Sequence, residues 1–213
     1  MKYKEILLEH FKAQPYFDKK ALYQLSEQYG LKTATVDSYV SRSLKSKEII
    51  SLKNGLYVSS DFYTKNKGDI SYLFYLANIL RGPSYLSSWT ALQYYNLTTE
   101  IIHTITSITL KVTRAYKTRI GHFSYHSINE ELFSGFSLVA GHPESPAGRF
   151  DFFIASPAKA LFDLLYFKTR QFRGVRFETI DSLVEDLRID MDEMSEEERE
   201  KFYTIIKNYI HHE

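Results

Sequence analysis

Residues 33–58 read TATVDSYVSRSLKSKEIISLKNGLYV, a sequence in which a helical pattern is followed by a hairpin signal. Its second half holds two short runs rich in apolar and β-branched residues, 49–52 and 56–58, joined through Asn54-Gly55. Asn-Gly between two such runs is the strongest short-range signal of a β-hairpin. We therefore expect a hairpin here, directly after a helix.

Apolar residues recur at helical spacing in three segments that precede this hairpin. The first helix is expected within residues 3–11, the second between the N-cap Asp18 and the C′ residue Gly30, and the third after the N-cap Thr33. The apolar positions of the three helices are Ile6, Leu7 and Phe11, then Leu22, Leu25 and Tyr29, then Val36, Val40 and Leu44. Helix, helix, tight turn, helix and hairpin is the order of a winged helix-turn-helix, which we predict for residues 1–60.

In a winged helix-turn-helix the third helix enters the DNA major groove, and the hairpin tip meets the phosphate backbone. The side of that helix opposite its apolar residues carries small, hydroxylated and basic side chains, which permit close approach and can reach guanine edges or phosphates. The predicted DNA-contacting residues are Thr35, Ser38, Ser41, Arg42, Lys45, Lys53 and Asn54. Modules of three helices and a hairpin also serve in protein–protein contacts, and this alternative stays open.

The charge of the chain is unevenly distributed, although its net charge is only +1. Residues 1–60 hold 10 Lys and Arg against 6 Asp and Glu, a net charge of +4, whereas residues 191–213 hold 3 against 7, a net charge of −4. A basic head with an acidic tail points to nucleic-acid contact. The alternative is surface charge without a partner.

Composition narrows the class of protein. Hydrophobic residues make up 44% and charged residues 25%, as in a globular protein, and the absence of cysteine excludes disulfides, thiolate metal sites and cysteine catalysis. The start of the chain lacks the apolar stretch of a signal peptide, and the longest apolar run, residues 72–80, is too short to span a bilayer. We expect a cytoplasmic protein without a membrane partner.

The rest of the chain predicts a second domain. Residues 61–68, mostly polar and ending in Gly68, are expected to form a linker, and residues 69–213 an α+β domain with a small mixed or antiparallel sheet and an acidic helical C-terminus. Strands are expected at 104–112, 123–128, 136–139 and 150–154, a surface loop at 141–148, and helices at 70–80, after Ser87, after Ser156-Pro157, at 180–187 and at 195–209.

Three runs of sequence carry a family resemblance. They are LYQLS at 22–26 with KEII at 47–50 and GLYV at 55–58, then PSYLSSWTALQYYNL at 83–97, and then ASPAKALFDLLY at 155–166. With these runs in this order the chain resembles the AbiEi-type antitoxins, described as transcriptional regulators of bacterial viral-defence systems.

The resemblance implies a winged helix-turn-helix that binds inverted repeats in its own promoter, followed by an antitoxin domain. It also implies a nucleotidyltransferase-like toxin encoded alongside, which the antitoxin counteracts without a stable complex, the type IV pattern of abortive infection. Inverted repeats predict two copies per operator, as a dimer or bound cooperatively. The alternative is an interaction module that neutralises a partner directly and does not bind DNA.

Candidate catalytic and metal-binding residues do not combine into a known pattern. His122 and His126 would face the same side of a strand, but a zinc site needs three or four ligands, so we expect no metal and no cofactor. A nuclease pattern built on Asp151 and Lys159 has Pro157 where a second carboxylate belongs, and Lys159 is better explained as a helix-surface partner of Asp163. We interpret Asp190-Met191-Asp192 as a solvated segment, and expect no catalytic residues and no enzyme.

One basic segment lies in the predicted second domain. No acidic residue occurs between Ile101 and Asn129, whereas Lys111, Arg114, Lys117 and Arg119 cluster there. The segment is either a solvated loop after a strand or an extension of the DNA-contacting surface.

Overall fold

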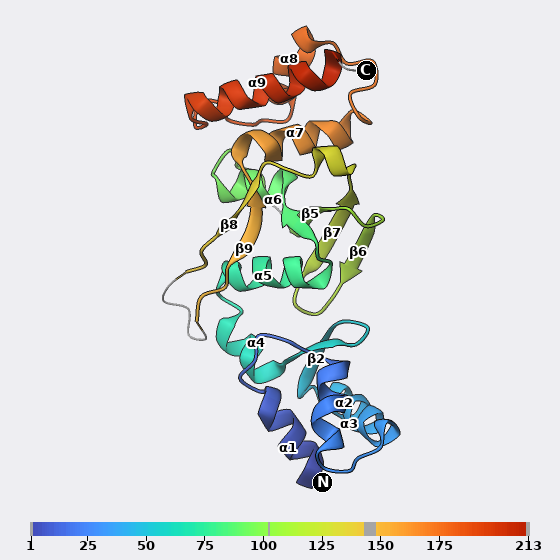
Figure 1. Ribbon diagram of the computed structural model, residues 1–213. Helices are drawn as coiled ribbons and strands as arrows, with labels where there is room; N and C mark the ends of the chain where they lie inside the picture. Colours follow the sequence, from blue (N-terminus) through green and yellow to red (C-terminus); the bar gives the residue numbers. More distant parts are fainter. Residues whose placement is uncertain (1, 102, 143–147, 212–213) are drawn as a thin grey trace. The chain divides into compact units, whose positions relative to one another are not determined.

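The computed structural model describes residues 2–101, 103–142 and 148–211. Most of the predicted surface loop at 141–148 lies outside the described residues. The chain has an α+β fold with one sheet of three strands and one of six (Figure 1). It divides into two compact units: unit 1 comprises Met1–Leu73, Tyr116–Gly121 and Gly141–Phe150, and unit 2 comprises Phe74–Ala115, His122–Ala140 and Asp151–Glu213.

Unit 1 contains the three helices and the hairpin that the sequence predicts. Its elements are α1 (Lys2–Phe11), β1 (Phe17–Asp18), α2 (Lys19–Glu27), α3 (Thr33–Lys45), β2 (Ile49–Lys53), β3 (Leu56–Ser59) and α4 (Ser60–Asn66). The strands form an antiparallel sheet in the order β1-β3-β2. The N-cap at Asp18 is confirmed, because its Oδ1 accepts a hydrogen bond from the Ala21 amide at 2.7 Å.

Two local predictions for unit 1 were wrong. Residues 61–68 were expected to be a linker, but most of them belong to helix α4, whose N-cap Ser59 accepts a hydrogen bond from the Phe62 amide and whose Phe62 is buried. The N-cap of α3 is Lys32 rather than Thr33, and its side chain makes no cap hydrogen bond. The predicted C′ glycine of α2 is confirmed: Gly30 adopts a φ of 66°, its amide donates to the Glu27 carbonyl, and the Leu31 amide donates to the Ser26 carbonyl, as in a Schellman cap.

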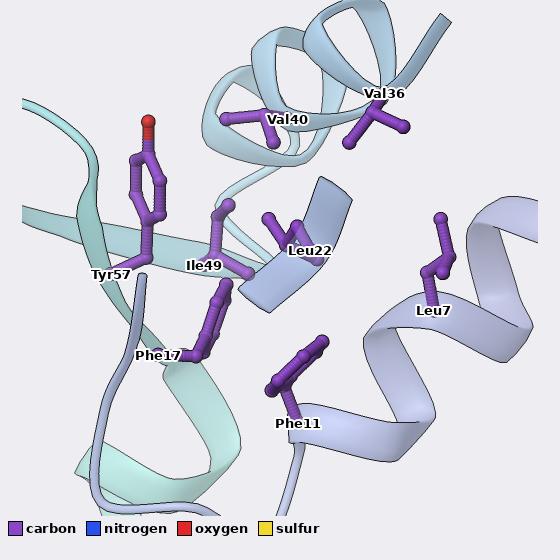
Figure 2. Packing of buried hydrophobic residues seen from close by; sticks show 8 residues of the cluster. All are labelled: Leu7, Phe11, Phe17, Leu22, Val36, Val40, Ile49 and Tyr57. Carbon is purple, nitrogen blue, oxygen red and sulfur yellow. The ribbon is translucent and has the colours of Figure 1, made fainter. Parts of the chain in front are cut away.

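The core of unit 1 explains why these elements pack together. Figure 2 shows side chains from all three helices and from the sheet converging on one another. They are Leu7, Phe11, Phe17, Leu22, Val36, Val40, Ile49 and Tyr57. Burying an apolar side chain of this size contributes about 1.5–3 kcal/mol, so the cluster fixes α3 against the other helices.

Unit 2 is built on the six-stranded sheet, whose order is β6-β7-β5-β4-β9-β8. The sheet is mixed: β4 pairs with β9 and β5 with β7 in parallel, while β4–β5 and β8–β9 are antiparallel. The strands are β4 (Ser84–Leu86), β5 (Thr104–Thr109), β6 (Arg114–Lys117), β7 (His122–Ser127), β8 (Phe136–Val139) and β9 (Phe152–Ala155). The helices are α6 (Ser88–Tyr94), α7 (Pro157–Lys168), α8 (Ile180–Asp186) and α9 (Glu196–His211), with 3₁₀ turns at Glu130–Leu132 and Phe177–Thr179. Helix α5 (Ile70–Leu80) begins in unit 1 and belongs to unit 2 from Phe74 onward.

Helices cover both faces of this sheet. The Tyr125 hydroxyl donates to the Ala77 carbonyl of α5, whereas the Tyr85 hydroxyl donates to Asp163 of α7. Tyr125 lies in register with Ser107 and Leu86, and the neighbouring positions, including Tyr85, face the other way because strand side chains alternate. None of the helices in the described part of the chain is long and apolar enough to cross a membrane.

Candidate nucleic-acid interface

Helix α3 presents a polar outer face opposite the core. Val36 and Val40 are buried. On the opposite face of the helix, Ala34, Ser38 and Ser41 are exposed. Arg42 and Lys45, at the C-terminal end of the helix, are exposed too, while Thr35 is half-buried. The outer face therefore has small side chains along its length and two cations at its end, the composition predicted for close approach to a DNA groove.

The position of α3 is fixed by a polar network that the sequence did not predict. Asp37 of α3 accepts hydrogen bonds from Lys19 Nζ at 2.8 Å and from the Tyr23 hydroxyl at 2.6 Å, both on α2. The Lys19 ammonium also lies 5.5 Å from the centre of the Tyr23 ring. Hydrogen bonding from Lys19, with a second bond from Tyr23, lowers the pKa of the Asp37 carboxyl below its ordinary value. The network holds α2 and α3 together, and Tyr23 also packs against the apolar core of unit 1.

The acidic side chains near α3 are neutralised by cations from other helices. Asp37 is paired with Lys19, and Glu48, which follows α3, is paired with Lys4 of α1 at 2.6 Å. Within the described residues no ion pair engages Arg42 or Lys45. The positive charge at the end of α3 thus stays available to an anion.

The hairpin places its two predicted contact residues differently. Asn54 is exposed at the tip, where Gly55 adopts a φ of 76° that suits glycine. Lys53 is the last residue of β2 and is half-buried, opposite Leu56 in a register that shifts between Ser51 and Lys53. Asn54 is therefore the more accessible of the two.

The second basic segment is exposed but divided. Lys111, Arg114, Lys117 and Arg119 all have exposed side chains. Lys111 and Arg114 belong to unit 2, whereas Lys117 and Arg119 belong to unit 1. The Lys111 ammonium donates to the Gly82 carbonyl, so part of its charge is used within unit 2. Arg114 and Lys117 are the first and last residues of strand β6, so this part of the segment is a strand rather than a loop.

The histidines and aspartates considered as metal ligands or catalytic groups belong to unit 2, whereas α3 belongs to unit 1. His122 and His126 lie on the same side of β7; burial lowers the pKa of His126, whose ring centre lies 5.0 Å from that of Phe167. Across the described residues no group of three or more His, Asp or Glu side chains could hold a metal ion. Asp190 and Asp192 are both exposed, as expected for a solvated segment.

Lys159 and Asp163 form the predicted ion pair, but its predicted position on the helix surface was wrong. The two atoms Lys159 Nζ and Asp163 Oδ1 lie 2.6 Å apart, and both side chains are buried. Asp163 also accepts hydrogen bonds from the Ser87 hydroxyl at 2.7 Å and the Tyr85 hydroxyl at 3.1 Å. Burial raises the pKa of Asp163, and the Lys159 ammonium opposes that effect. All of these partners are buried within unit 2. Because Tyr85 lies on β4 and Ser87 is the N-cap of α6, the cluster joins α7 to β4 and to the start of α6.

Comparison with known protein families and with curated proteins gives no match to this chain. The geometry of the α3 face and of the hairpin is therefore what bears on function.

Proposed function

We propose that this protein is a double-stranded DNA-binding transcriptional regulator whose unit 1 is a winged helix-turn-helix. Helix α3 enters the major groove, and the hairpin tip contacts the phosphate backbone. The observation that carries the proposal is the outer face of α3, where exposed small residues end in the exposed cations Arg42 and Lys45. The net charge of +4 over residues 1–60 supports it, because phosphate contacts dominate the affinity of DNA-binding proteins.

The resemblance to AbiEi-type antitoxins extends this proposal to a biological role. The protein represses its own operon by binding inverted repeats in the promoter, with two copies per operator, and counteracts a nucleotidyltransferase-like toxin encoded alongside. Two copies follow from the two-fold symmetry of an inverted repeat. Co-expression of the neighbouring gene with and without this protein tests the antitoxin role, and unrelieved growth arrest would contradict it.

A mobility-shift titration with the upstream region of its own gene tests DNA binding. It is run at two salt concentrations with scrambled DNA of equal length. We expect retention of the upstream region that weakens at higher salt, because counterion release drives binding. Absence of a shift at low salt would overturn the regulator proposal and favour an interaction module that does not bind DNA.

Paired substitutions locate the binding surface. Arg42→Ala with Lys45→Ala is expected to weaken operator binding about tenfold or more, since a good base contact alone contributes ~1–3 kcal/mol. The matched control is Lys65→Ala with Lys67→Ala, which removes two exposed positive charges of unit 1 that lie outside α3 and the hairpin. An equal loss of affinity in both double variants would show a nonspecific charge effect and refute the assignment of α3.

A further inference from the structure

Strand β8 forms one edge of the six-stranded sheet, and Figure 1 shows it beside β9. Among the described residues β9 is its sole strand partner. The Gly135 carbonyl accepts a hydrogen bond from the Ser156 amide at 2.9 Å, one step before the first β8–β9 pair. Hydrogen-bonded and non-hydrogen-bonded pairs alternate along an antiparallel ladder. The backbone of Ser137, two residues after Gly135, is therefore hydrogen-bonded to β9, whereas the backbones of Phe136 and Leu138 are not. Phe136 and Leu138 therefore direct their N–H and C=O groups away from the sheet.

Apart from its short length of four residues, this edge lacks the usual protection against pairing with another strand. Natural edge strands are blocked by charged side chains, proline or a covering element. The four residues of β8, Phe-Ser-Leu-Val, include neither a charge nor a proline. Leu138 is 56% exposed, and Phe153, directly opposite it on β9, is 41% exposed. The edge thus combines open backbone groups with an exposed apolar pair.

A groove runs alongside the start of β8. It has a volume of about 550 Å³ and is bounded by the first residues of β8, the first turn of α7 and one side of α9. Phe136 and Ile205 give it apolar walls, and Glu197, Glu200 and Lys201 stand on its α9 side. Lys201 is paired with Glu197 at 2.7 Å and with Glu198 at 3.0 Å. Glu200 is exposed and has no ion-pair partner among the described residues, so the α9 side keeps a negative charge.

We propose that the β8 edge and this groove bind an extended segment of a partner protein, which adds to the sheet as a further strand. Its backbone pairs with Phe136 and Leu138, and its side chains alternate between apolar residues and basic residues, one of which meets Glu200. Alternation follows from the period of two in a strand. A second copy of this chain is a poorer occupant, because its own β8 has no basic side chain to offer Glu200. This surface is independent of the proposed DNA-binding face.

Fluorescence anisotropy with the full chain tests the proposal. The probe is a labelled octapeptide of alternating lysine and valine, compared with the same peptide N-methylated at its valine amides and with a glutamate–valine version. We expect saturable binding of the first peptide alone. The Leu138→Pro variant removes an outward N–H without deleting a bond to β9, since proline is tolerated at such edge positions. It is expected to weaken binding about fivefold, the contribution of one hydrogen bond.

Charge variants complete the test. Glu200→Lys is expected to weaken binding by a similar factor, whereas Glu193→Lys, an exposed acidic residue that does not line the groove, is expected to leave it unchanged. Thermal unfolding checks that each variant is folded, and Leu138→Lys replaces Leu138→Pro if the latter is not. Equal binding of the N-methylated peptide, an equal reduction in Glu193→Lys, or absence of saturation below about 1 mM would overturn the proposal. So would a wild-type dimer in sedimentation velocity that Leu138→Pro abolishes, because the second copy would then occupy the edge.

Discussion

The carboxylate of Asp163 is the most deeply buried charge in the described part of the protein. We therefore expect its removal to lower the free energy of unfolding strongly. Asp163→Asn keeps groups that can bond to Ser87 and Tyr85 but leaves the Lys159 ammonium buried without a counter-charge. Breaking one side of a buried ion pair costs about 3–5 kcal/mol of unfolding free energy. Urea unfolding followed by the fluorescence of Trp89, the single tryptophan, measures this loss for unit 2.

Two further variants show whether the loss of stability comes from the unpaired charge. Lys159→Met with Asp163→Asn removes both charges and keeps an acceptor for Ser87 and Tyr85, so we expect it to recover most of the stability. Glu185→Gln, at an exposed carboxylate, is expected to change the unfolding free energy by less than about 0.5 kcal/mol. A double variant as unstable as Asp163→Asn would show that packing, rather than charge, explains the effect.

The Lys19–Asp37 pair makes a prediction about pH. Because hydrogen bonding from Lys19 lowers its pKa, the Asp37 carboxyl is expected to titrate below its ordinary value of 3.8. The stabilisation from this pair is therefore complete above pH 3.8 and is lost as pH falls through the lowered pKa. Carboxyl ¹³C NMR titration measures the midpoint, which Lys19→Met should raise. Both side chains are partly exposed, so the stability change should stay below about 1 kcal/mol.

Single-residue predictions succeeded where a local spacing decides the contact. The spacing of Lys159 and Asp163 predicted their ion pair, but the same spacing occurs on buried and exposed helix faces, so burial could not be predicted from it. Ser87 occupies the expected N-cap position of α6, yet its hydroxyl donates to Asp163, far along the chain. Long-range partners of this kind have no signature in the local sequence.

At the scale of elements, α7 and α9 are joined through a helix N-terminus. Glu198 Oε2 of α9 accepts a hydrogen bond from the Ala158 amide in the first turn of α7 at 2.9 Å, beside the N-cap Ser156. Burial raises the pKa of the Glu198 carboxyl, but the bonds from Ala158, Ser156 and Lys201 outweigh it and lower that pKa below its ordinary value of 4.5. The carboxylate thus stabilises α7 through its orphan N–H groups and its dipole.

Removing that carboxylate should destabilise unit 2. Glu198→Ala is expected to cost about 1.5–2 kcal/mol of unfolding free energy, and Glu198→Gln about half of that. The difference from wild type should shrink as pH falls below 4.5, because the wild-type carboxyl is then increasingly protonated. Glu197→Ala, an exposed neighbour on α9, is the control, with an expected cost below about 0.5 kcal/mol. A pH-independent difference would mean that the charge of Glu198 is not responsible.

Elements with a strong periodic or turn signal were predicted well, and short polar ones were not. The Asn54-Gly55 turn and the alternation of apolar residues in β5 were sufficient to place those strands. Helix α4 was missed because Phe62 is its one buried apolar residue, so no apolar residues recur at helical spacing. Its other residues are mostly polar and resemble a linker. The strand order, with β4 between β5 and β9, depends on pairing between distant segments and could not be predicted from patterning.

For the whole molecule, the distribution of charge predicts how salt would affect the proposed DNA binding. If Arg114 and Lys117 neutralise DNA phosphates, Arg114→Glu with Lys117→Glu should flatten the slope of log K against log salt by about 0.9 for each phosphate that is no longer neutralised. Arg173→Glu with Arg176→Glu makes the same charge change on unit 2 residues outside that segment. Mobility-shift titrations over a salt series measure both slopes. An unchanged slope for the first pair would exclude that segment from the DNA-binding surface.

Unit 1 is assembled from three separate stretches of the sequence, whereas we predicted an N-terminal domain made of one continuous stretch, residues 1–60. The Phe150 ring centre lies 4.8 Å from that of Tyr72 and 6.3 Å from that of Phe62, so an aromatic contributed late in the chain completes the packing around α4. Recombination that exchanged only the 5′ end of the gene would leave Phe150 behind with a mismatched neighbour. If unit 1 binds an operator as proposed, new operator preferences in such a lineage should therefore arise by point substitution on the outside of α3, not by shuffling of gene segments.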